Sequence, residues 1–256
     1  MENYCNDIWA AIYDQYNMGR HERELAFYSS ALSAVEGPVL EIACGTGMIL
    51  LPLLERGMDA YGFDLSPQML RVLFQKAEQK KIGGIHSRVT IQNMADFRYE
   101  IAFGAVIVPA RSFLHLTTQA DQIRCLKTIR SHLRIGGQVL LNFFTPNLAA
   151  ILKNAVSEPV RQDFGTFRYR DTDQEVRVSY VQRNSIAEQV QRITWQFEMA
   201  GQLSESSMEV SWIYRKEFEL LAQVAGLHVV ALYSGFERAP YDGQGEMVWV
   251  LERSSE

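Results

Sequence analysis

The sequence contains no uninterrupted apolar run that approaches the length of a membrane-spanning helix. Its first residues, MENYCNDIWAAIYDQYN, also lack the basic region followed by an apolar block that marks a signal peptide. We therefore expect a cytoplasmic protein that has no membrane partner.

Cysteine is scarce, and its spacing argues against two kinds of site. Cys5, Cys44 and Cys125 lie far apart and form no CxxC pair, so the sequence predicts neither a zinc site nor a disulfide framework. Cys44 has no visible activating partner, and we interpret it as a small buried residue rather than a nucleophile. The histidines at 21, 86, 132 and 228 have no metal-ligand companions, and no acidic cluster of metal-ligand type is present, so we expect no metal.

The chain also lacks an excess of positive charge. Its 25 Lys and Arg residues face 30 Asp and Glu residues, which gives a net charge of −5 and a pI of about 5.6. A protein that binds the phosphate backbone usually carries a basic surface, so we expect no duplex nucleic acid as a partner. The 256 residues and 47% hydrophobic content suffice for one α/β core with a modest insertion.

What the sequence does contain, between residues 38 and 144, is an alternation of short apolar segments and helical patterns. Nearly continuous apolar strands that alternate with helices indicate a parallel sheet covered on both faces, which binds ligands at the carboxyl ends of its strands. The predicted strands are 38–43, 59–64, 88–94, 103–109 and 136–144, and the predicted helices between them are 48–57, 66–80 and 119–133.

The pattern changes after Pro146. A short helix over 147–157 is expected first. Apolar and polar residues then alternate, which predicts antiparallel strands with one solvated face at 167–171, 176–183, 192–199 and 208–214. The helix–strand alternation resumes with a helix at 215–227 and strands at 228–236 and 245–253.

These patterns predict an α/β fold: a doubly wound, Rossmann-like, mostly parallel seven-stranded sheet with helices on both faces, plus a small antiparallel β insertion. We expect residues 1–146 and 212–256 to form the core, with 1–35 as a helical cap, and residues 147–211 to form the insertion. The insertion would serve as a substrate lid or as the interface of a homodimer.

The segment PVLEIACGTG, residues 38–47, places an acid, Glu41, inside a buried strand and follows it with Gly45 and Gly47. Glycines in the loop after the first strand let the backbone approach a ligand closely. A dinucleotide site would read GxGxxG, but Leu50 occupies the third glycine position, so the match to that motif is poor.

EIACGTG resembles the first motif of the class I S-adenosylmethionine (SAM)-dependent methyltransferases, which is an acid, three residues and then GxG. Three further segments resemble family motifs in the same order: GFDLSPQML (62–70), NMADF (93–97) and LRIGGQVLLNFF (133–144). Four motifs at normal spacings form a specific signal. The resemblance covers roughly residues 36–146, with weaker support in 215–253. It implies SAM as cofactor and S-adenosylhomocysteine as product.

The resemblance also implies roles for individual residues. Asp64, at the end of the second strand, would accept hydrogen bonds from the ribose hydroxyls, as in NAD sites. Asp96 and Phe97 would bind the adenine amine and pack against its ring. Glu41 would act near the methionine amine, often through water or by shaping the loop. Asp64 could instead be a helix-start acid, and Asp96 could cap a turn.

The two glycines of the motif would clear space for the methionine portion and the ribose, or they are ordinary turn glycines. The full set of expected cofactor contacts is Tyr13, Glu41, Ala43, Cys44, Gly45, Gly47, Asp64, Leu65, Met69, Ala95, Asp96, Phe97 and Pro109.

The segment IWAAIYDQYN is similar to a YD-containing opening found in many small-molecule members of the family, in which a helix closes over the cofactor. Tyr13 is the best match to the aromatic near the methionine end and is a catalytic candidate. Tyr16 is a candidate for substrate contact. Both residues could instead belong to the apolar face of the helix.

The loop VPARSFLHLTT, residues 108–118, departs from the (N/D/S)PP(Y/F) signature of enzymes that methylate nucleobases or protein glutamine. His115 is the candidate general base, since its pKa lies near working pH, although it could simply pack or cap a helix. Arg111 could pair with a substrate carboxylate or phosphate, with Asp96 or Glu41, or lie on the surface.

The aromatic residues of the predicted insertion could form the core of a small sheet, the wall of a substrate pocket or a dimer interface. Trp195 is the one we expect to contact substrate, together with Tyr16, Arg111 and His115. We expect in-line methyl transfer from SAM to a nitrogen or oxygen of a small-molecule acceptor, with nitrogen slightly favoured. The alternatives are a tRNA or peptide methyltransferase, or a SAM-binding regulatory protein without turnover.

Overall fold

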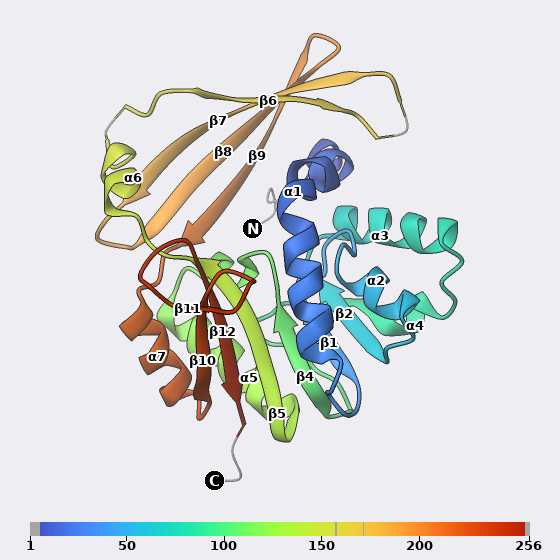
Figure 1. Ribbon diagram of the computed structural model, residues 1–256. Helices are drawn as coiled ribbons and strands as arrows, with labels where there is room; N and C mark the ends of the chain where they lie inside the picture. The colour runs from blue at the N-terminus through green and yellow to red at the C-terminus, as the bar shows by residue number, and fades with distance from the viewer. Residues whose placement is uncertain (1–5, 157, 171, 254–256) are drawn as a thin grey trace.

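The computed structural model describes residues 6–156, 158–170 and 172–253, so Cys5 lies outside the described residues. A large sheet with helices on both faces forms one part of the molecule, and a smaller sheet lies over the carboxyl ends of its parallel strands (Figure 1). None of the helices within the described ranges is long and apolar enough to cross a membrane.

The large sheet has eight strands in the order β11-β10-β12-β5-β4-β1-β2-β3. β12 runs antiparallel to β5 and β10, β11 runs antiparallel to β10, and the other pairs are parallel. The predicted mostly parallel α/β sheet is therefore confirmed, and the eighth strand is the two-residue β11. The strands are β1 Val39–Ile42, β2 Ala60–Asp64, β3 Val89–Ile91, β4 Phe103–Val108, β5 Leu133–Phe144, β10 His228–Ser234, β11 Ala239–Pro240 and β12 Glu246–Glu252.

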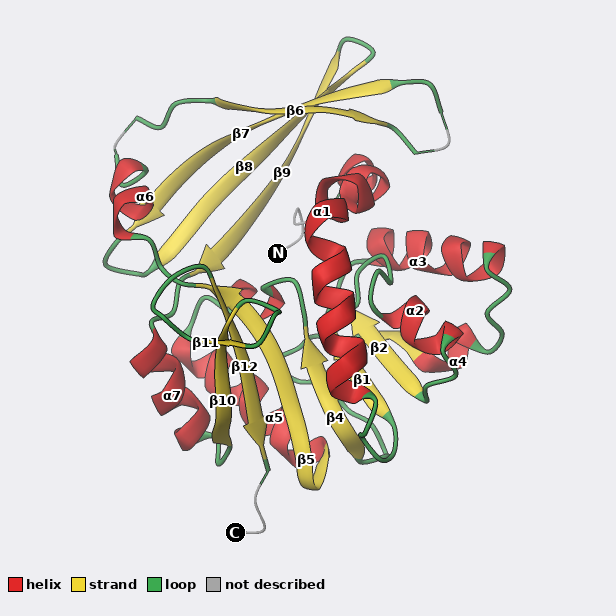
Figure 2. Cartoon of the chain, in the orientation of Figure 1, coloured by secondary structure: helices red, strands yellow, loops and turns green. Residues whose placement is uncertain are grey.

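Helices cover both faces of this sheet (Figure 2). Buried side chains of α5 and α7 pack on one face, and those of α1, α2, α3 and α4 pack on the other. The helices are α1 Asp7–Leu32, α2 Leu50–Glu55, α3 Pro67–Gln79, α4 Ile85–Arg88, α5 Gln119–His132, α6 Leu148–Lys153 and α7 Arg215–Val224, with a 3-10 turn η1 at Ser112–His115.

Local capping explains where α1 and α3 begin. The side chain of Asn6 accepts a hydrogen bond from the Trp9 amide at 2.7 Å, and that of Ser66 accepts one from the Met69 amide at 3.2 Å. Pro67 occupies the first turn of α3, where a missing N–H costs nothing. The predicted helix at 66–80 therefore begins within one residue of α3.

The smaller sheet consists of β6 Gln162–Arg168, β7 Glu175–Ser185, β8 Val190–Met199 and β9 Gln202–Ser211, all antiparallel and in that order. The chain enters it from β5 through α6 and leaves it into α7 (Figure 1). One face packs on the N-terminal half of α1 through Trp9, Trp195 and Phe197.

The predicted first strand of this sheet, residues 167–171, is wrong, because β6 begins five residues earlier at Gln162. The register shifts between Asp163 and Gly165, where Gly165 has φ 141°, and this irregularity breaks the period-two pattern in the sequence. The chain is already in the turn to β7 at Tyr169, whose amide donates to the Gln174 carbonyl at 2.8 Å.

Gly104→Ala should destabilise the protein, because a Cβ at this position in β4 would overlap the backbone oxygen of Glu36 and lie 2.9 Å from Val35 Cγ1. The expected loss is about 1–3 kcal/mol of unfolding free energy, as for other overpacked sites. Chemical denaturation measures it. Gly83→Ala is the matched control, since nothing lies within 4 Å of its added Cβ. Equal stabilities for the two variants would contradict this packing argument.

Candidate active site

Three cavities adjoin at the carboxyl ends of the parallel strands, and Tyr13 of α1 lines all three. We call them the β2 cavity, which is lined by Asp64, Leu65, Met69 and Asn93; the β1 cavity, lined by His21, Glu24, Glu41 and Thr46; and the aromatic cavity, lined by Trp9, Tyr16, Phe164, Tyr180 and Trp195.

Asp64 ends β2 and is held by two backbone amides. Its Oδ2 accepts a hydrogen bond from the Gly45 N–H at 2.9 Å, and its Oδ1 accepts one from the Ser66 N–H at 2.8 Å. Burial raises the pKa of Asp64, and the bonds from Ser66 and Gly45 oppose that rise. A carboxylate oxygen has more than one acceptor position, so Asp64 can still receive hydroxyl donors from the β2 cavity.

The two glycines of the first motif have different surroundings. Gly45 (φ 54°) lines both the β1 and the β2 cavity, and an added Cβ would meet nothing closer than 4.0 Å. Gly47 (φ 78°) lines none of the three cavities, and an added Cβ would lie 2.8 Å from Leu51 Cγ and 2.9 Å from Leu73 Cγ. Gly45 therefore leaves room for a ligand, whereas Gly47 lets the loop pack on α2 and α3.

The segment after β3 differs from the prediction. β3 ends at Ile91, three residues earlier than expected, and the chain turns there, with the Asp96 amide donating to the Asn93 carbonyl at 3.0 Å. Asn93 and Met94 consequently line the β2 cavity, while Asp96 is exposed outside it.

Phe97 and Ala95, two further expected cofactor contacts, are buried in the core instead of lining the cavity. Phe97 packs on Phe63 with ring centroids 5.1 Å apart and on His132 at 4.8 Å. Asn93 can supply the polar contact that was expected of Asp96. Its carboxamide can both donate and accept hydrogen bonds.

The β1 cavity is acidic. Glu41 is 3% exposed, and its Oε2 has no hydrogen-bond partner among the described residues. Burial raises the pKa of Glu41 well above its usual range, and the nearby charges of Asp64 and Glu24 add to the rise. A cation bound in this cavity would relieve the repulsion between these acids.

Cys44 also lines the β1 cavity, and burial raises the pKa of its thiol well above the usual range. The thiol therefore stays protonated at neutral pH and is no nucleophile, in agreement with its interpretation from the sequence.

Helix α1 is fixed to the first motif by Asp14. Its Oδ1 accepts a hydrogen bond from Thr46 Oγ1 at 2.5 Å, and its Oδ2 accepts one from Lys76 Nζ at 2.8 Å. On the next residue, Gln15 Nε2 donates to the Arg168 carbonyl of β6 at 2.7 Å, and Gln15 Oε1 accepts from the Arg168 amide at 3.1 Å. These contacts hold Tyr13 where the cavities meet.

Several residues at these cavities were missed from the sequence. Asn17, His21 and Glu24 line the β1 cavity beside Tyr13. Counted from Tyr13, each follows the one before it by three or four residues, which puts them on one face of a helix and was a usable signal. Gln92, Ser112 and Leu116 line the β2 cavity without any comparable pattern.

The aromatic cavity brings together all four predicted substrate residues, Tyr16, Arg111, His115 and Trp195. None of the described residues that line it is acidic. Burial lowers the pKa of His115 to about 4, against the opposing effect of its hydrogen bond to the Glu209 backbone. The imidazole is therefore neutral at pH 7 and a weak base.

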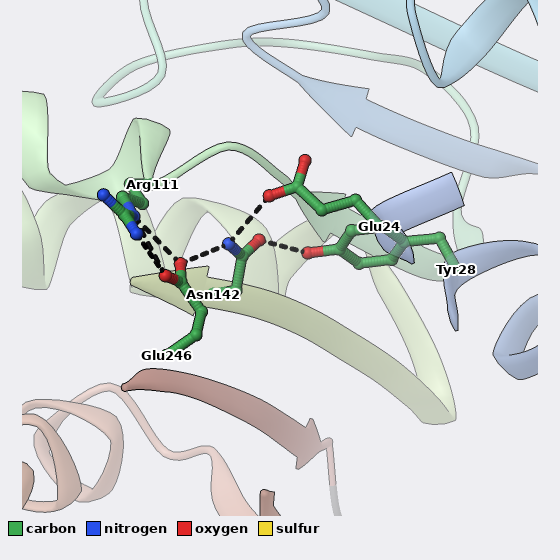
Figure 3. A network of polar contacts seen from close by, with 5 residues as sticks. All are labelled: Glu24, Tyr28, Arg111, Asn142 and Glu246. Atoms are coloured by element: carbon green, nitrogen blue, oxygen red, sulfur yellow. Dashed lines mark hydrogen bonds and ion pairs between the residues drawn. The ribbon is translucent and has the colours of Figure 1, made fainter. Parts of the chain in front are cut away.

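Arg111 pairs with neither Asp96 nor Glu41, the two internal partners considered from the sequence. Its Nη2 lies 2.5 Å from Glu246 Oε2 and its Nε 3.0 Å from the same oxygen. Asn142 Nδ2 donates to Glu246 Oε1 at 2.7 Å and to Glu24 Oε1 at 3.2 Å, and Asn142 Oδ1 accepts from Tyr28 Oη at 2.7 Å (Figure 3). The network joins the β1 cavity, through Glu24, to the aromatic cavity, through Arg111.

Comparison with known proteins agrees with this geometry. Residues 39–137 match the model of a family described as a methyltransferase domain. The chain is 25% identical over 216 residues to the cypemycin N-terminal methyltransferase of a Streptomyces species, which covers 84% of this chain and 82% of that protein.

Two solved structures extend the comparison. The CcbJ methyltransferase from Streptomyces caelestis superposes with a TM-score of 0.71 at 25% identity and covers 91% of this chain and 94% of its own. SAM-bound CalS10, an amino pentose methyltransferase from Micromonospora echinaspora, has a TM-score of 0.64 at 20% identity and covers 95% and 97% of the two chains. At 20% identity, the likeness to CalS10 shows that the two proteins share a fold.

Residues 39–137 are thus similar to a methyltransferase domain, and the chain as a whole has the fold of SAM-dependent methyltransferases. S-adenosylmethionine is the cofactor bound to CalS10. The cavities fit that cofactor, because the orphaned Glu41 oxygen lies where a positive charge is favourable and Asp64 can accept from hydroxyl groups.

Most of the predicted cofactor contacts line the β1 or β2 cavity, and their roles as ligands stay predictions. These are Tyr13, Glu41, Ala43, Cys44, Gly45, Asp64, Leu65, Met69 and Pro109.

Asp64→Ala should weaken binding of S-adenosylhomocysteine by about tenfold or more, because a charged acceptor of hydroxyl groups is lost. Asp96→Ala should bind as the wild type does, since Asp96 lies outside the β2 cavity. Calorimetry measures both affinities. Thermal denaturation of Asp64→Ala controls for disruption of the loop, since both Asp64 oxygens also accept backbone amides. Equal losses for the two alanine variants would restore the role expected for Asp96 from the sequence.

Glu41→Gln should raise the stability of the cofactor-free protein at pH 7, because a neutral amide avoids the cost of burying an ionisable carboxyl. The pKa of this carboxyl is higher in the folded than in the unfolded chain, so the wild type loses stability as pH rises above about 4.5. The advantage of the variant should therefore vanish below that pH.

Denaturation at several pH values measures the effect, with the exposed Glu100→Gln as control. The same Glu41→Gln substitution should weaken SAM binding, because an amide, unlike the carboxyl, cannot ionise when a cation binds in the β1 cavity. A variant that is less stable than the wild type at pH 7 would contradict the argument.

Proposed function

We propose that this protein is a SAM-dependent N-methyltransferase that binds a small-molecule amine in the aromatic cavity. One observation carries the proposal: Tyr13 lines the acidic β1 cavity, the β2 cavity with Asp64, and the aromatic cavity. A cofactor that extends from Glu41 to Asp64 passes Tyr13, where the aromatic cavity opens. In this proposal, the predicted catalytic role of Tyr13 is to form the wall of the site at the point where the methyl group is transferred.

When bound, SAM supplies an activated methyl group, which the acceptor nitrogen takes by in-line displacement of S-adenosylhomocysteine. The protein contributes alignment and exclusion of water. Glu41 and Glu24 stabilise positive charge at one end of the site, and Asp64 orients hydroxyl groups at the other. Trp9 of α1 and Trp195 of β8, stacked with ring centroids 5.0 Å apart, close the acceptor side.

Nitrogen is favoured over oxygen as the acceptor atom by the state of His115. A hydroxyl acceptor must lose its proton as the new bond forms, and an imidazole whose pKa is about 4 removes it poorly at neutral pH. A neutral amine has a free lone pair and needs no base during transfer. The lack of an acid among the described residues of the aromatic cavity also favours binding of the amine in its neutral form.

A peptide amine is the second candidate. The curated relative with 25% identity over 216 residues is named an N-terminal methyltransferase. In this chain an open groove lined by Arg23, Glu237 and Asp242 adjoins the aromatic cavity at Arg111, so a longer acceptor can continue onto the surface. A tRNA acceptor has less support because of the net charge of −5.

A panel of amines, phenols, carboxylates and short peptides with free or acetylated N-termini tests the function. The expected result is methylation of amines alone, with the new methyl group on nitrogen and kcat/KM rising with pH as the amine deprotonates. Peptides that react faster than small amines would favour the second candidate. Transfer to oxygen alone would overturn the proposal. Cofactor binding without any transfer would favour a regulatory protein.

His115→Ala should retain amine methylation within about tenfold of wild type, whereas loss of a true general base costs about 10²–10⁴-fold. The measurement is the rate of S-adenosylhomocysteine release with saturating SAM. His228→Ala, an exposed position at the start of β10, is the control. A loss of 10²-fold or more in His115→Ala alone would assign His115 as the base and favour a hydroxyl acceptor.

A further inference from the structure

The indole of Trp195 is held rigidly in the wall of the aromatic cavity. It lies on β8 opposite Tyr180 of β7 and Ser206 of β9. Trp9 stacks on it at 5.0 Å, and Phe164 meets it edge-on at 4.9 Å between ring centroids. Neighbours on several sides fix the direction in which its N–H points.

That N–H has no hydrogen-bond partner among the described residues, although the side chain is only 6% exposed. Leaving a buried donor unpaired is unfavourable, so such a group calls for an explanation. Trp249 has the same unpaired N–H but lies in the core against Phe143 and Phe218 and lines none of the four cavities described above. Trp195 differs because its side chain lines the aromatic cavity.

The cavity around Trp195 is electrically neutral. Its cation, Arg111, is paired with Glu246, and the low pKa of His115 leaves that imidazole uncharged. The remaining polar groups include two carboxamides: Gln182, whose Nε2 donates to Asn184 Oδ1 at 2.9 Å, and Gln191. A carboxylate on the acceptor would find no unpaired cation here, whereas an uncharged oxygen finds neutral donors.

We propose that the Trp195 indole N–H donates a hydrogen bond to an uncharged oxygen of the methyl acceptor, and thereby selects amines that carry an amide carbonyl or a hydroxyl group. The inference rests on the proposed function and adds the chemistry of the acceptor beside its nitrogen. The aromatic rings contact the apolar body of the acceptor, and the indole N–H recognises its oxygen.

Four matched amines test the proposal: phenylalaninamide, phenylalaninol, phenylalanine and 2-phenylethylamine. At saturating SAM the wild type should prefer the amide or the alcohol over 2-phenylethylamine and phenylalanine by about 5- to 100-fold in kcat/KM, the range for one unpaired buried donor. Trp195→Phe keeps an aromatic ring and should bring the preference over 2-phenylethylamine close to one through the acceptor KM, with the SAM KM unchanged. Trp249→Phe should keep the wild-type preference.

Nuclear magnetic resonance supplies a direct readout. The indole proton of Trp195, assigned by its loss in Trp195→Phe, should move downfield when the preferred amine is added to the complex with S-adenosylhomocysteine, and should not move downfield with 2-phenylethylamine. An unchanged preference in Trp195→Phe, or equal turnover of all four amines by the wild type, would overturn this inference and leave N-methylation intact. Turnover of no amine in this set or in the wider panel would overturn both.

Discussion

The hydrogen bonds from Thr46 and Lys76 to the Asp14 carboxylate are the contacts on which the site depends. They bind α1 to the loop after β1 and to α3, and so place Tyr13, the preceding residue, at the meeting point of three cavities. Thr46 is 1% exposed, so this contact is shielded from the water that weakens most surface pairs. Without this contact, α1 would not be held in place between the acceptor side and the cofactor side of the site.

The charged residues differ between the cofactor side and the acceptor side of the site. Glu24, Glu41 and Asp64 are buried on the cofactor side, where a sulfonium and an amine bring positive charge. On the acceptor side the one arginine is neutralised by Glu246. Asn142 stands between the two sides and uses both amide hydrogens, one for each glutamate (Figure 3). The site can therefore attract a cationic donor without also favouring a protonated, unreactive amine.

The sequence predicted the large sheet because parallel strands buried on both faces leave continuous apolar segments. The motifs are local, and the structure places their residues Asp64 and Gly45 beside the β2 cavity, where their roles as ligands stay predictions. Prediction from the sequence failed where the outcome depends on distant partners. Nothing near Arg111 indicates Glu246, which lies 135 residues away. The placement of Asp96 failed because the end of β3 decides which residue faces the cavity, and strand ends are weakly encoded. β6 was misplaced because a bulge at Gly165 interrupts its alternation.

The position of the smaller sheet has a consequence for how such enzymes diversify. The chain leaves the core after Phe144 and returns at Arg215, and Phe143 and Phe218 beside these points pack together with ring centroids 5.1 Å apart. A different sheet could be grafted between two such neighbouring points while the cofactor motifs stay untouched. The first half of α1 would have to change with it, because Trp9 and Gln15 contact the sheet, whereas Asp14 and Glu24 serve the core. New acceptors would then arise from paired changes in two segments far apart in the gene.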